Sequence, residues 1–264
     1  MRRTLLAVAT CIALPALATD TATWTQPAKP HVIYGNTYFV GTKGISAVLI
    51  TSPQGHVLID GTLEENVPLI EESVRKLGFR VEDIKVILNS HAHFDHAGGI
   101  AGLARDSGAT VRATPAGARE LGLGGDDASD PQHGEAKLFP KVKAVGDIAD
   151  GTVVRVGPLA ITAHITPGHT AGGTAWTWES CEGKACKSIA YVDSLSALAA
   201  DGYRYSDHPD FVAAFRKTFD RVDALPCDIL VAPHPEQATG KTCKTYADAG
   251  RKRLAQQLAK ESGK

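Results

Sequence analysis

Short apolar runs separated by turn residues alternate along this chain with stretches of helical periodicity. In the first half, residues 45–50 and 56–60 have the composition of β-strands and are joined by a Ser-Pro-Gln-Gly turn. Residues 66–77 then carry apolar side chains at helical spacing, with a proline in the first turn and Gly78 after the end. Residues 84–88 follow as an apolar run that predicts a buried strand.

The second half continues this alternation. Residues 152–156 and 159–165 predict a hairpin across a Gly-Pro turn. Further strands are predicted over 174–178, 188–192 and 229–232, and helices over 210–225 and 246–260. Because strands and helices alternate in blocks, the pattern favours two sheets packed together with helices outside them.

Composition limits the class of protein. The 264 residues permit one large domain or two small ones, and no repeat, low-complexity tract or linker divides them. A hydrophobic content of 43% is enough for a sizeable core, which excludes a disordered chain. The net charge of −1 argues against a nucleic-acid partner, because such a partner needs a basic face.

The N-terminus has the pattern of a secretory signal. Two arginines precede an apolar stretch, residues 5–17, that is too short to span a bilayer, and Ala18 completes a small-x-small cleavage site. We therefore predict a signal peptide over residues 1–18 and a single exported domain over residues 19–264, located in the periplasm. The alternative is an uncleaved anchor; no other run is long and apolar enough to cross a membrane.

Four cysteines remain after the predicted cleavage. An even number in an oxidising compartment indicates two disulfides, which allow three connectivities. Pairing Cys181 with Cys186 and Cys227 with Cys243 is the simplest, because each pair is local. The alternative, that some of them bind zinc, lacks a nearby histidine or second cysteine pair.

Residues 91–96 read His-Ala-His-Phe-Asp-His, directly after the predicted strand 84–88. Ligands bind at the carboxyl ends of such strands in α/β sheets. Imidazoles with a carboxylate make an N/O ligand set that suits zinc. A catalytic zinc takes only three protein ligands and keeps a position open for water, so four candidates in one segment indicate two metals.

Two further histidines stand directly after predicted strands. His169 lies in a Pro-Gly-His-Thr stretch and His234 lies between two prolines, positions that suit rigid ligand loops. We predict that both complete the metal shells. An isolated histidine is usually a surface or core residue, and we assign that role to His31, His56, His133, His164 and His208.

The pattern H-x-H-x-D-H, with a later Gly-His and a later His, resembles the signature of the metallo-β-lactamase fold. The resemblance covers nearly all of the chain after the signal peptide and implies an α+β fold, an αββα four-layer sandwich with two mixed sheets packed face to face. Five other stretches resemble the third subclass of class B β-lactamases: Trp24-Thr25-Gln26-Pro27, Leu58-Ile59-Asp60-Gly61, Thr166-Pro167-Gly168-His169-Thr170, Asp193-Ser194-Leu195-Ser196 and Ala232-Pro233-His234-Pro235.

This resemblance implies two zinc ions. In that subclass the residues matching His91, His93 and His169 hold the first zinc, and those matching Asp95, His96 and His234 hold the second. The other subclasses place a cysteine ligand about where Ser194 stands, and no cysteine lies there in this chain. The pair Cys227 and Cys243 also resembles a disulfide of the third subclass.

The resemblance also implies roles around the metals. Ser194 and Ser196 match residues that hydrogen-bond the substrate's carboxylate. Asp60 resembles a carboxylate that steadies the site, although an aspartate before Gly61 is equally typical of a turn. Asp95 is expected to be catalytic, because it would orient the attacking hydroxide as well as bind the second zinc.

The implied function is a zinc-dependent β-lactamase that hydrolyses penicillins, cephalosporins and carbapenems and confers antibiotic resistance. Zinc lowers the pKa of bound water from about 15.7 towards about 7, which provides a hydroxide at neutral pH. The chain has no G-x-S-x-G motif to support a serine route. We expect a small-molecule β-lactam as the partner, no nucleic acid or membrane, and a monomer.

Two other functions are compatible with the same ligands. Hydrolases of lactones or thioesters on this scaffold carry a bridging aspartate after a late strand, and Asp193 lies next to that place. A periplasmic zinc-binding protein without catalysis would keep the ligands but lack an open cleft.

Overall fold

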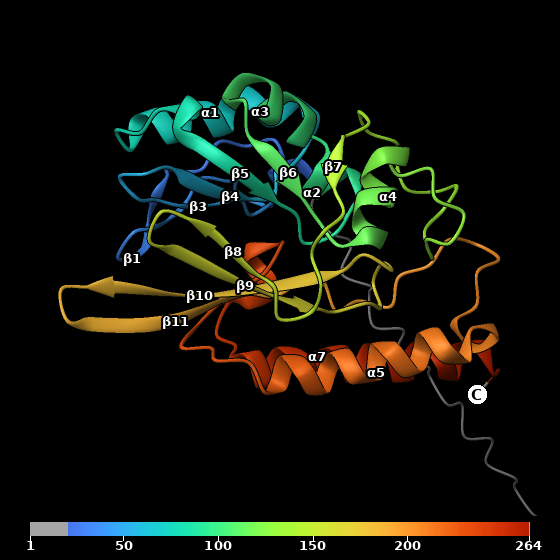
Figure 1. The fold of residues 1–264 in the computed structure, drawn as a ribbon. Coiled ribbons are helices and arrows are strands. Elements are labelled where there is room, and N and C mark those ends of the chain that lie inside the picture. Colours follow the sequence, from blue (N-terminus) through green and yellow to red (C-terminus); the bar gives the residue numbers. More distant parts are fainter. Residues whose placement is uncertain (1–20, 264) are drawn as a thin grey trace, which may run out of the picture.

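The computed structural model describes residues 21–263, and the predicted signal peptide, residues 1–18, lies outside the described residues. Two sheets face each other between outer layers of helices (Figure 1). The first sheet has the order β1-β2-β3-β4-β5-β6-β7, antiparallel from β1 to β4 and parallel from β4 to β7. Its strands are His31–Tyr34, Thr37–Phe39, Val48–Ile50, His56–Ile59, Ile84–Leu88, Thr110–Arg112 and Ala144–Val145.

The second sheet has the order β12-β11-β10-β9-β8. Only the β11–β12 pair is parallel, so this sheet is mixed as well. Its strands in chain order are Val153–Val156, Leu159–Ile165, Thr174–Glu182, Ala185–Tyr191 and Ile229–Val231. The predicted αββα sandwich with two mixed sheets is confirmed.

Helices cover both outer faces. In Figure 1, α1 (Val67–Lys76) and α3 (Ile100–Ser107) lie over the first sheet, and α5 (Pro209–Asp223) and α7 (Cys243–Glu261) lie over the second. The remaining helices are α2 (Phe94–Ala97), α4 (Pro115–Leu123), α6 (Pro235–Ala238) and the short 3₁₀ turns η1 (Thr21–Thr23), η2 (Glu64–Asn66), η3 (Val81–Asp83) and η4 (Tyr205–Asp207). Within residues 21–263, no helix has the length and apolar character that a membrane span requires.

The core between the sheets contains two tryptophans of β10. Trp176 and Trp178 are buried there and pack with residues such as Leu88 and Tyr191. A buried indole N–H needs a partner, and that of Trp176 donates to the Asn89 carbonyl at 3.1 Å. The core thus supports the segment that leads into the histidine motif.

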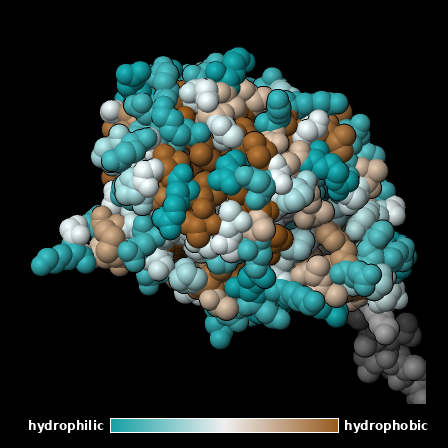
Figure 2. All heavy atoms as spheres, viewed as in Figure 1, coloured by the Kyte–Doolittle hydropathy of each residue, from teal (hydrophilic) through white to brown (hydrophobic). Residues whose placement is uncertain are grey.

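Both predicted disulfides are present. Cys181 pairs with Cys186 across the β10–β11 hairpin, and Cys227 pairs with Cys243 at the start of α7. Polar residues cover most of the face seen in Figure 2, with hydrophobic residues exposed between them near its centre.

Some predicted boundaries were wrong. The strand predicted over 45–50 begins only at Val48, because Ser46 turns towards the loop after β12: its N–H donates to the Pro233 carbonyl and its hydroxyl to the Ala232 carbonyl, both at 2.7 Å. The helices α3 and α4 and the strands β6 and β7 were not predicted.

Candidate metal centre

All six predicted ligands line one cavity of about 140 Å³ at the carboxyl ends of the strands. The first four come from the loop after β5 and from α2, whose N-cap is His93 in extended conformation. His169 follows β9 and His234 follows β12. All six side chains are buried, so the fold gathers polar groups where a core would exclude them unless they were paired or bound to a metal.

The first group consists of His91, His93 and His169. One ring nitrogen from each lies within 4.8 Å of the others, and the rings meet edge to face with centroids 4.6–4.8 Å apart. His93 Nδ1 is 3.2 Å from His169 Nε2.

Each histidine of this first group has an outer partner for its other ring nitrogen. His91 Nδ1 lies 2.7 Å from an Asp193 carboxylate oxygen, and His93 Nε2 lies 3.0 Å from Asp130 Oδ2. His169 Nδ1 lies 2.9 Å from the carbonyl oxygen of Ser196. A neutral imidazole that donates outward presents a lone pair inward, and two facing lone pairs at 3.2 Å repel unless a proton or a cation lies between them.

The second group consists of the remaining predicted ligands, Asp95, His96 and His234; in the structure, ligand atoms of Asp95 and His96 also converge with one of His91. Asp95 Oδ2 is 3.2 Å from His96 Nε2 and 3.4 Å from His234 Nε2. His234 Nδ1 contacts the Gly44 carbonyl at 3.0 Å. His96 Nδ1 is buried and has no hydrogen-bond partner in the part of the chain that the structure describes. Nε2 of both imidazoles faces the Asp95 carboxylate, and a donor set of imidazoles with one carboxylate fits zinc.

The electrostatics of three candidate ligands favour the protonation states that bind a metal. Burial, with neighbouring imidazoles, lowers the pKa of His91 well below its usual value and that of His169 to about 3. Burial alone would raise the pKa of Asp95, but His96 and His234 outweigh it and hold that pKa well below the usual range. Neutral histidines and an ionised carboxylate are the forms that bind a metal.

Asp60 is buried beneath the motif and supports it. Its carboxylate accepts hydrogen bonds from Asn89 Nδ2 at 2.9 Å, from the Ser90 N–H and hydroxyl at 2.7 Å each, and from the Tyr191 hydroxyl at 2.7 Å. Its φ of 62° is unusual for a residue other than glycine. The geometry therefore favours the steadying role over that of a simple turn aspartate.

Two carboxylates near the site were not predicted from the sequence. Asp130, in the loop between α4 and β7, contacts His93, and Glu120 of α4 accepts the Gly172 N–H at 3.0 Å. Burial, with the nearby charge of Asp130, raises the pKa of Glu120 to about 7. No local motif marks either residue, since only the fold brings them to the site.

The predicted substrate-binding serines also line the cavity. Ser194 is buried, and its backbone N–H donates to Asp193 Oδ1 at 2.7 Å. The Ser196 hydroxyl is 3.1 Å from His169 Nδ1. Ser196 therefore touches the first group directly, whereas the backbone of Ser194 contacts the carboxylate that holds His91.

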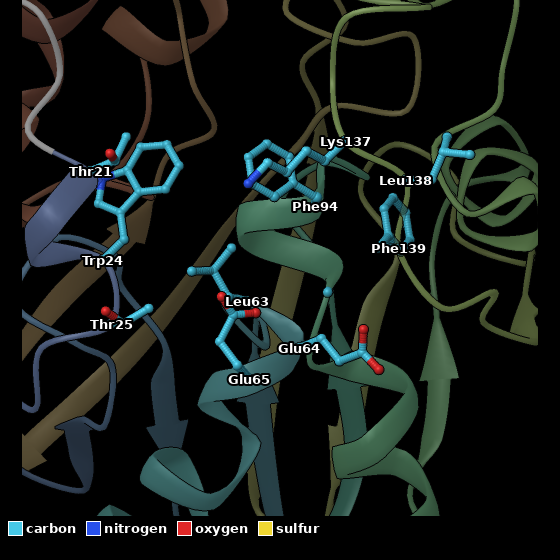
Figure 3. A pocket seen from close by; sticks show the side chains of 11 residues that line it. Thr21, Trp24, Thr25, Leu63, Glu64, Glu65, Phe94, Lys137, Leu138 and Phe139 are labelled. Carbon is cyan, nitrogen blue, oxygen red and sulfur yellow. The ribbon is translucent and has the colours of Figure 1, made fainter.

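A second cavity of about 400 Å³ adjoins the first, and Trp24 and Phe94 line both. Their ring centroids are 6.1 Å apart. Figure 3 shows the Trp24 ring to the left of the Phe94 ring, with Leu63, Glu64 and Glu65 below them. The metal cavity is thus extended by a partly apolar groove that has room for substituents of a substrate.

Comparison with known proteins gives a consistent result. Residues 40–181 match the family described as the metallo-beta-lactamase superfamily. The SMB-1 metallo-beta-lactamase bound to 2-mercaptoethanesulfonate is 47% identical, with a TM-score of 0.85 over 90% of this chain and 99% of that one. MEM-A1, a subclass B3 enzyme from a soil metagenome library, is 44% identical, with a TM-score of 0.87 over 91% of this chain and 99% of that one.

Two further matches cover very different shares of the chain. MIM-1 from Novosphingobium pentaromativorans is 42% identical, with a TM-score of 0.88 over 91% of this chain and 93% of that one. A hydroxyacylglutathione hydrolase of Anaeromyxobacter dehalogenans is 39% identical over only 93 residues, which are 35% of this chain. The match spans 28% of that curated relative's length.

Proposed function

The chain belongs to the metallo-beta-lactamase superfamily, and we propose that it is a zinc-dependent β-lactamase of subclass B3. One observation carries this proposal: the six buried candidate ligands are five histidines and an aspartate, with no cysteine among them. Similarity to B3 enzymes over about nine-tenths of the chain supports the same conclusion.

We infer that two zinc ions bind, one in each group. His91, His93 and His169 would hold the first, and Asp95, His96 and His234 the second. Zinc in this position supplies Lewis acidity and lowers the pKa of bound water towards about 7.

The chain's own residues position the reaction. Asp95 remains ionised because its pKa is held low, so its carboxylate can accept a hydrogen bond from the attacking water and orient it. Ser194 and Ser196 stand in the cavity wall, where they would donate hydrogen bonds to the carboxylate that β-lactams carry. The six candidate ligands are buried side chains, so bulk water has little access to them.

A thioester or lactone hydrolase is the second candidate, favoured by the short match to the hydroxyacylglutathione hydrolase. The position of Asp193 weighs against it. Asp193 Oδ1 is engaged by His91 Nδ1 and by the Ser194 N–H, each at 2.7 Å, and Asp193 is not in the groups whose ligand atoms converge. A bridging aspartate would instead lie among those atoms.

We propose that the protein acts in the periplasm after removal of residues 1–18 and that it confers resistance to β-lactams. Its two disulfides support an oxidising compartment.

The test is hydrolysis of nitrocefin by purified protein before chelation, after chelation and after zinc is added back, with metal content measured at each stage. We expect two zinc ions per chain, loss of hydrolysis on chelation and recovery on reconstitution. A hydroxyacylglutathione thioester serves as the competing substrate. Rapid thioester turnover without nitrocefin turnover would transfer the assignment to the second candidate, and zinc binding without turnover of either would indicate a binding protein.

A further inference from the structure

Asp130 lies in the loop between α4 and β7, far along the chain from the histidine motif. Its side chain is 8% exposed, and its two oxygens have different partners. Oδ2 is 3.0 Å from His93 Nε2, and Oδ1 accepts the backbone N–H of Gln132 at 2.6 Å. The carboxylate is therefore fixed at one oxygen by its own loop and aims the other at His93.

An ionised carboxylate can only accept hydrogen bonds, so this contact requires a proton on His93 Nε2. The other ring nitrogen, Nδ1, then presents its lone pair towards His169 Nε2, 3.2 Å away. Without this outer partner, His93 could carry its proton on Nδ1, where a metal would have to bind.

The loop that carries Asp130 is itself held against the site. The Pro131 carbonyl accepts the Ala200 N–H at 2.8 Å, and Glu135 Oε1 accepts the Asp201 N–H at 2.6 Å. These bonds join the loop to the segment that follows Ser196. Two hydrogen bonds thus fix the loop that carries Asp130. Asp130 needs such a fixed loop if it is to hold the imidazole ring of His93 in one orientation.

We propose that Asp130 is a positioning residue for the metal centre, which fixes the tautomer and orientation of His93 so that Nδ1 faces the first metal. This inference rests on the proposed zinc site. Outer partners of this kind change metal affinity by about 10- to 100-fold when they are replaced.

The substitution Asp130→Asn separates positioning from simple support. Asparagine can keep its oxygen on the Gln132 N–H, but its NH₂ group then faces His93 Nε2 and donates. That donation favours the His93 tautomer with the proton on Nδ1, which competes with the metal. The opposite side-chain orientation would place the NH₂ group against the Gln132 N–H, two donors face to face.

Asp126→Asn is the matched control. Asp126 lies in the same loop and also contacts an imidazole, His133 Nε2 at 3.1 Å, but both side chains are exposed and lie away from the cavity lining. Metal-free wild type, D130N and D126N are compared first by thermal unfolding. Zn²⁺ affinity is then measured by competition with a chromophoric chelator, and the visible spectrum of the Co²⁺ form reports on the first site.

We expect D130N to weaken binding of one metal by about 10- to 100-fold and to change the Co²⁺ spectrum, while the other metal and D126N stay at wild-type values. D130E, which restores an acceptor, should recover part of the affinity. Equal zinc affinities in wild type and D130N would overturn the positioning role without contradicting the proposed zinc site. If the wild type binds no metal, the proposed function falls and this inference falls with it.

A second measurement does not depend on folding of the variant. In zinc-loaded wild type, ¹H–¹⁵N spectra of the imidazoles should place the ring proton of His93 on Nε2 and the metal on Nδ1. The reverse assignment would overturn the proposal even if D130N fails to fold.

Discussion

The two ligand groups differ in what holds them. In the first group each of the three histidines has a partner for its outer ring nitrogen: Asp193 and the Ser196 carbonyl from the loop after β11, and Asp130 from the loop between α4 and β7. Within residues 21–263, His234 alone in the second group has such a partner, the Gly44 carbonyl. Asp95 and His96 contact each other, and His96 Nδ1 has no partner within the described residues.

This difference indicates two degrees of preorganisation. Ligands that are already fixed by outer contacts lose little conformational freedom when a metal binds. In the second group the metal has to replace the contacts that Asp95 makes with His96 and His234. We therefore expect the first group to bind zinc more tightly than the second, and the variants below test that order.

Removal of a first-group ligand should have the largest effect. His169→Ala should lower kcat/KM for nitrocefin by about 10⁴-fold, roughly 5.5 kcal/mol, because the site that binds first is lost. His164→Ala is the control, since His164 lies in β9 and contacts Thr177 Oγ1 at 2.8 Å rather than a candidate ligand. A loss of activity below tenfold in H169A, or an equal loss in H164A, would contradict the ranking.

Removal of a second-group ligand should cost less. His234→Ala should lower kcat/KM by about 10³-fold, roughly 4 kcal/mol, while one zinc per chain is retained after gel filtration. The number of zinc ions retained is the more decisive measurement, because preorganisation predicts that the first group keeps its zinc when the second group is disrupted. Loss of both metals in H234A would show that the two groups bind as one unit.

Some residues of this centre can be recognised from the sequence around them, whereas others gain a role only through the fold. The strands β5 and β9 have the predicted bounds, because each is an apolar run ended by polar or turn residues. The six candidate ligands could be named because four lie within six consecutive positions, and His169 and His234 stand in the loops that follow such runs. The helices α3 and α4 were not predicted because they have only eight and nine residues, fewer than the roughly 11 over which helical periodicity can be recognised.

The outer partners could not be predicted in the same way. Asp130 and Glu120 look like ordinary polar residues in sequence, and only the return of their segments onto the site gives them a role. Ser196 holds His169 partly through its backbone carbonyl, and a carbonyl leaves no signal in residue identity. The preorganisation that distinguishes the two groups is therefore a property of tertiary structure.

Glu120 supports the first group through the loop that carries His169. Its raised pKa makes the stability of the metal-free fold depend on pH. Its folded-state pKa of about 7 lies above the ordinary 4.5, so the folded protein retains a proton that the unfolded chain releases. The associated stability is fully present below about pH 4.5 and is lost as pH rises through 7, a change of roughly 3 kcal/mol.

Glu120→Gln should remove this pH dependence while keeping an acceptor for the Gly172 N–H. The measurement is the free energy of unfolding of metal-free protein from pH 4.5 to about 8, with exposed Glu72→Gln as the control. We expect the gap between wild type and E120Q to widen in favour of E120Q as pH rises. A constant gap would show that Glu120 is not protonated in the fold.

The smallest expected effect concerns substrate binding beside the two groups. Ser194→Ala should raise KM for a penicillin by about tenfold with kcat nearly unchanged, because one hydrogen bond to a charged group is lost in ground and transition state alike. The Ser194 N–H that contacts Asp193 is retained in this variant, so His91 keeps its outer partner.

Ser196→Ala should differ: its hydroxyl lies 3.1 Å from His169 Nδ1, so zinc affinity should fall as well as substrate affinity. If both variants change KM alone, the Ser196 hydroxyl contributes nothing to holding the first group, and the backbone carbonyl is sufficient.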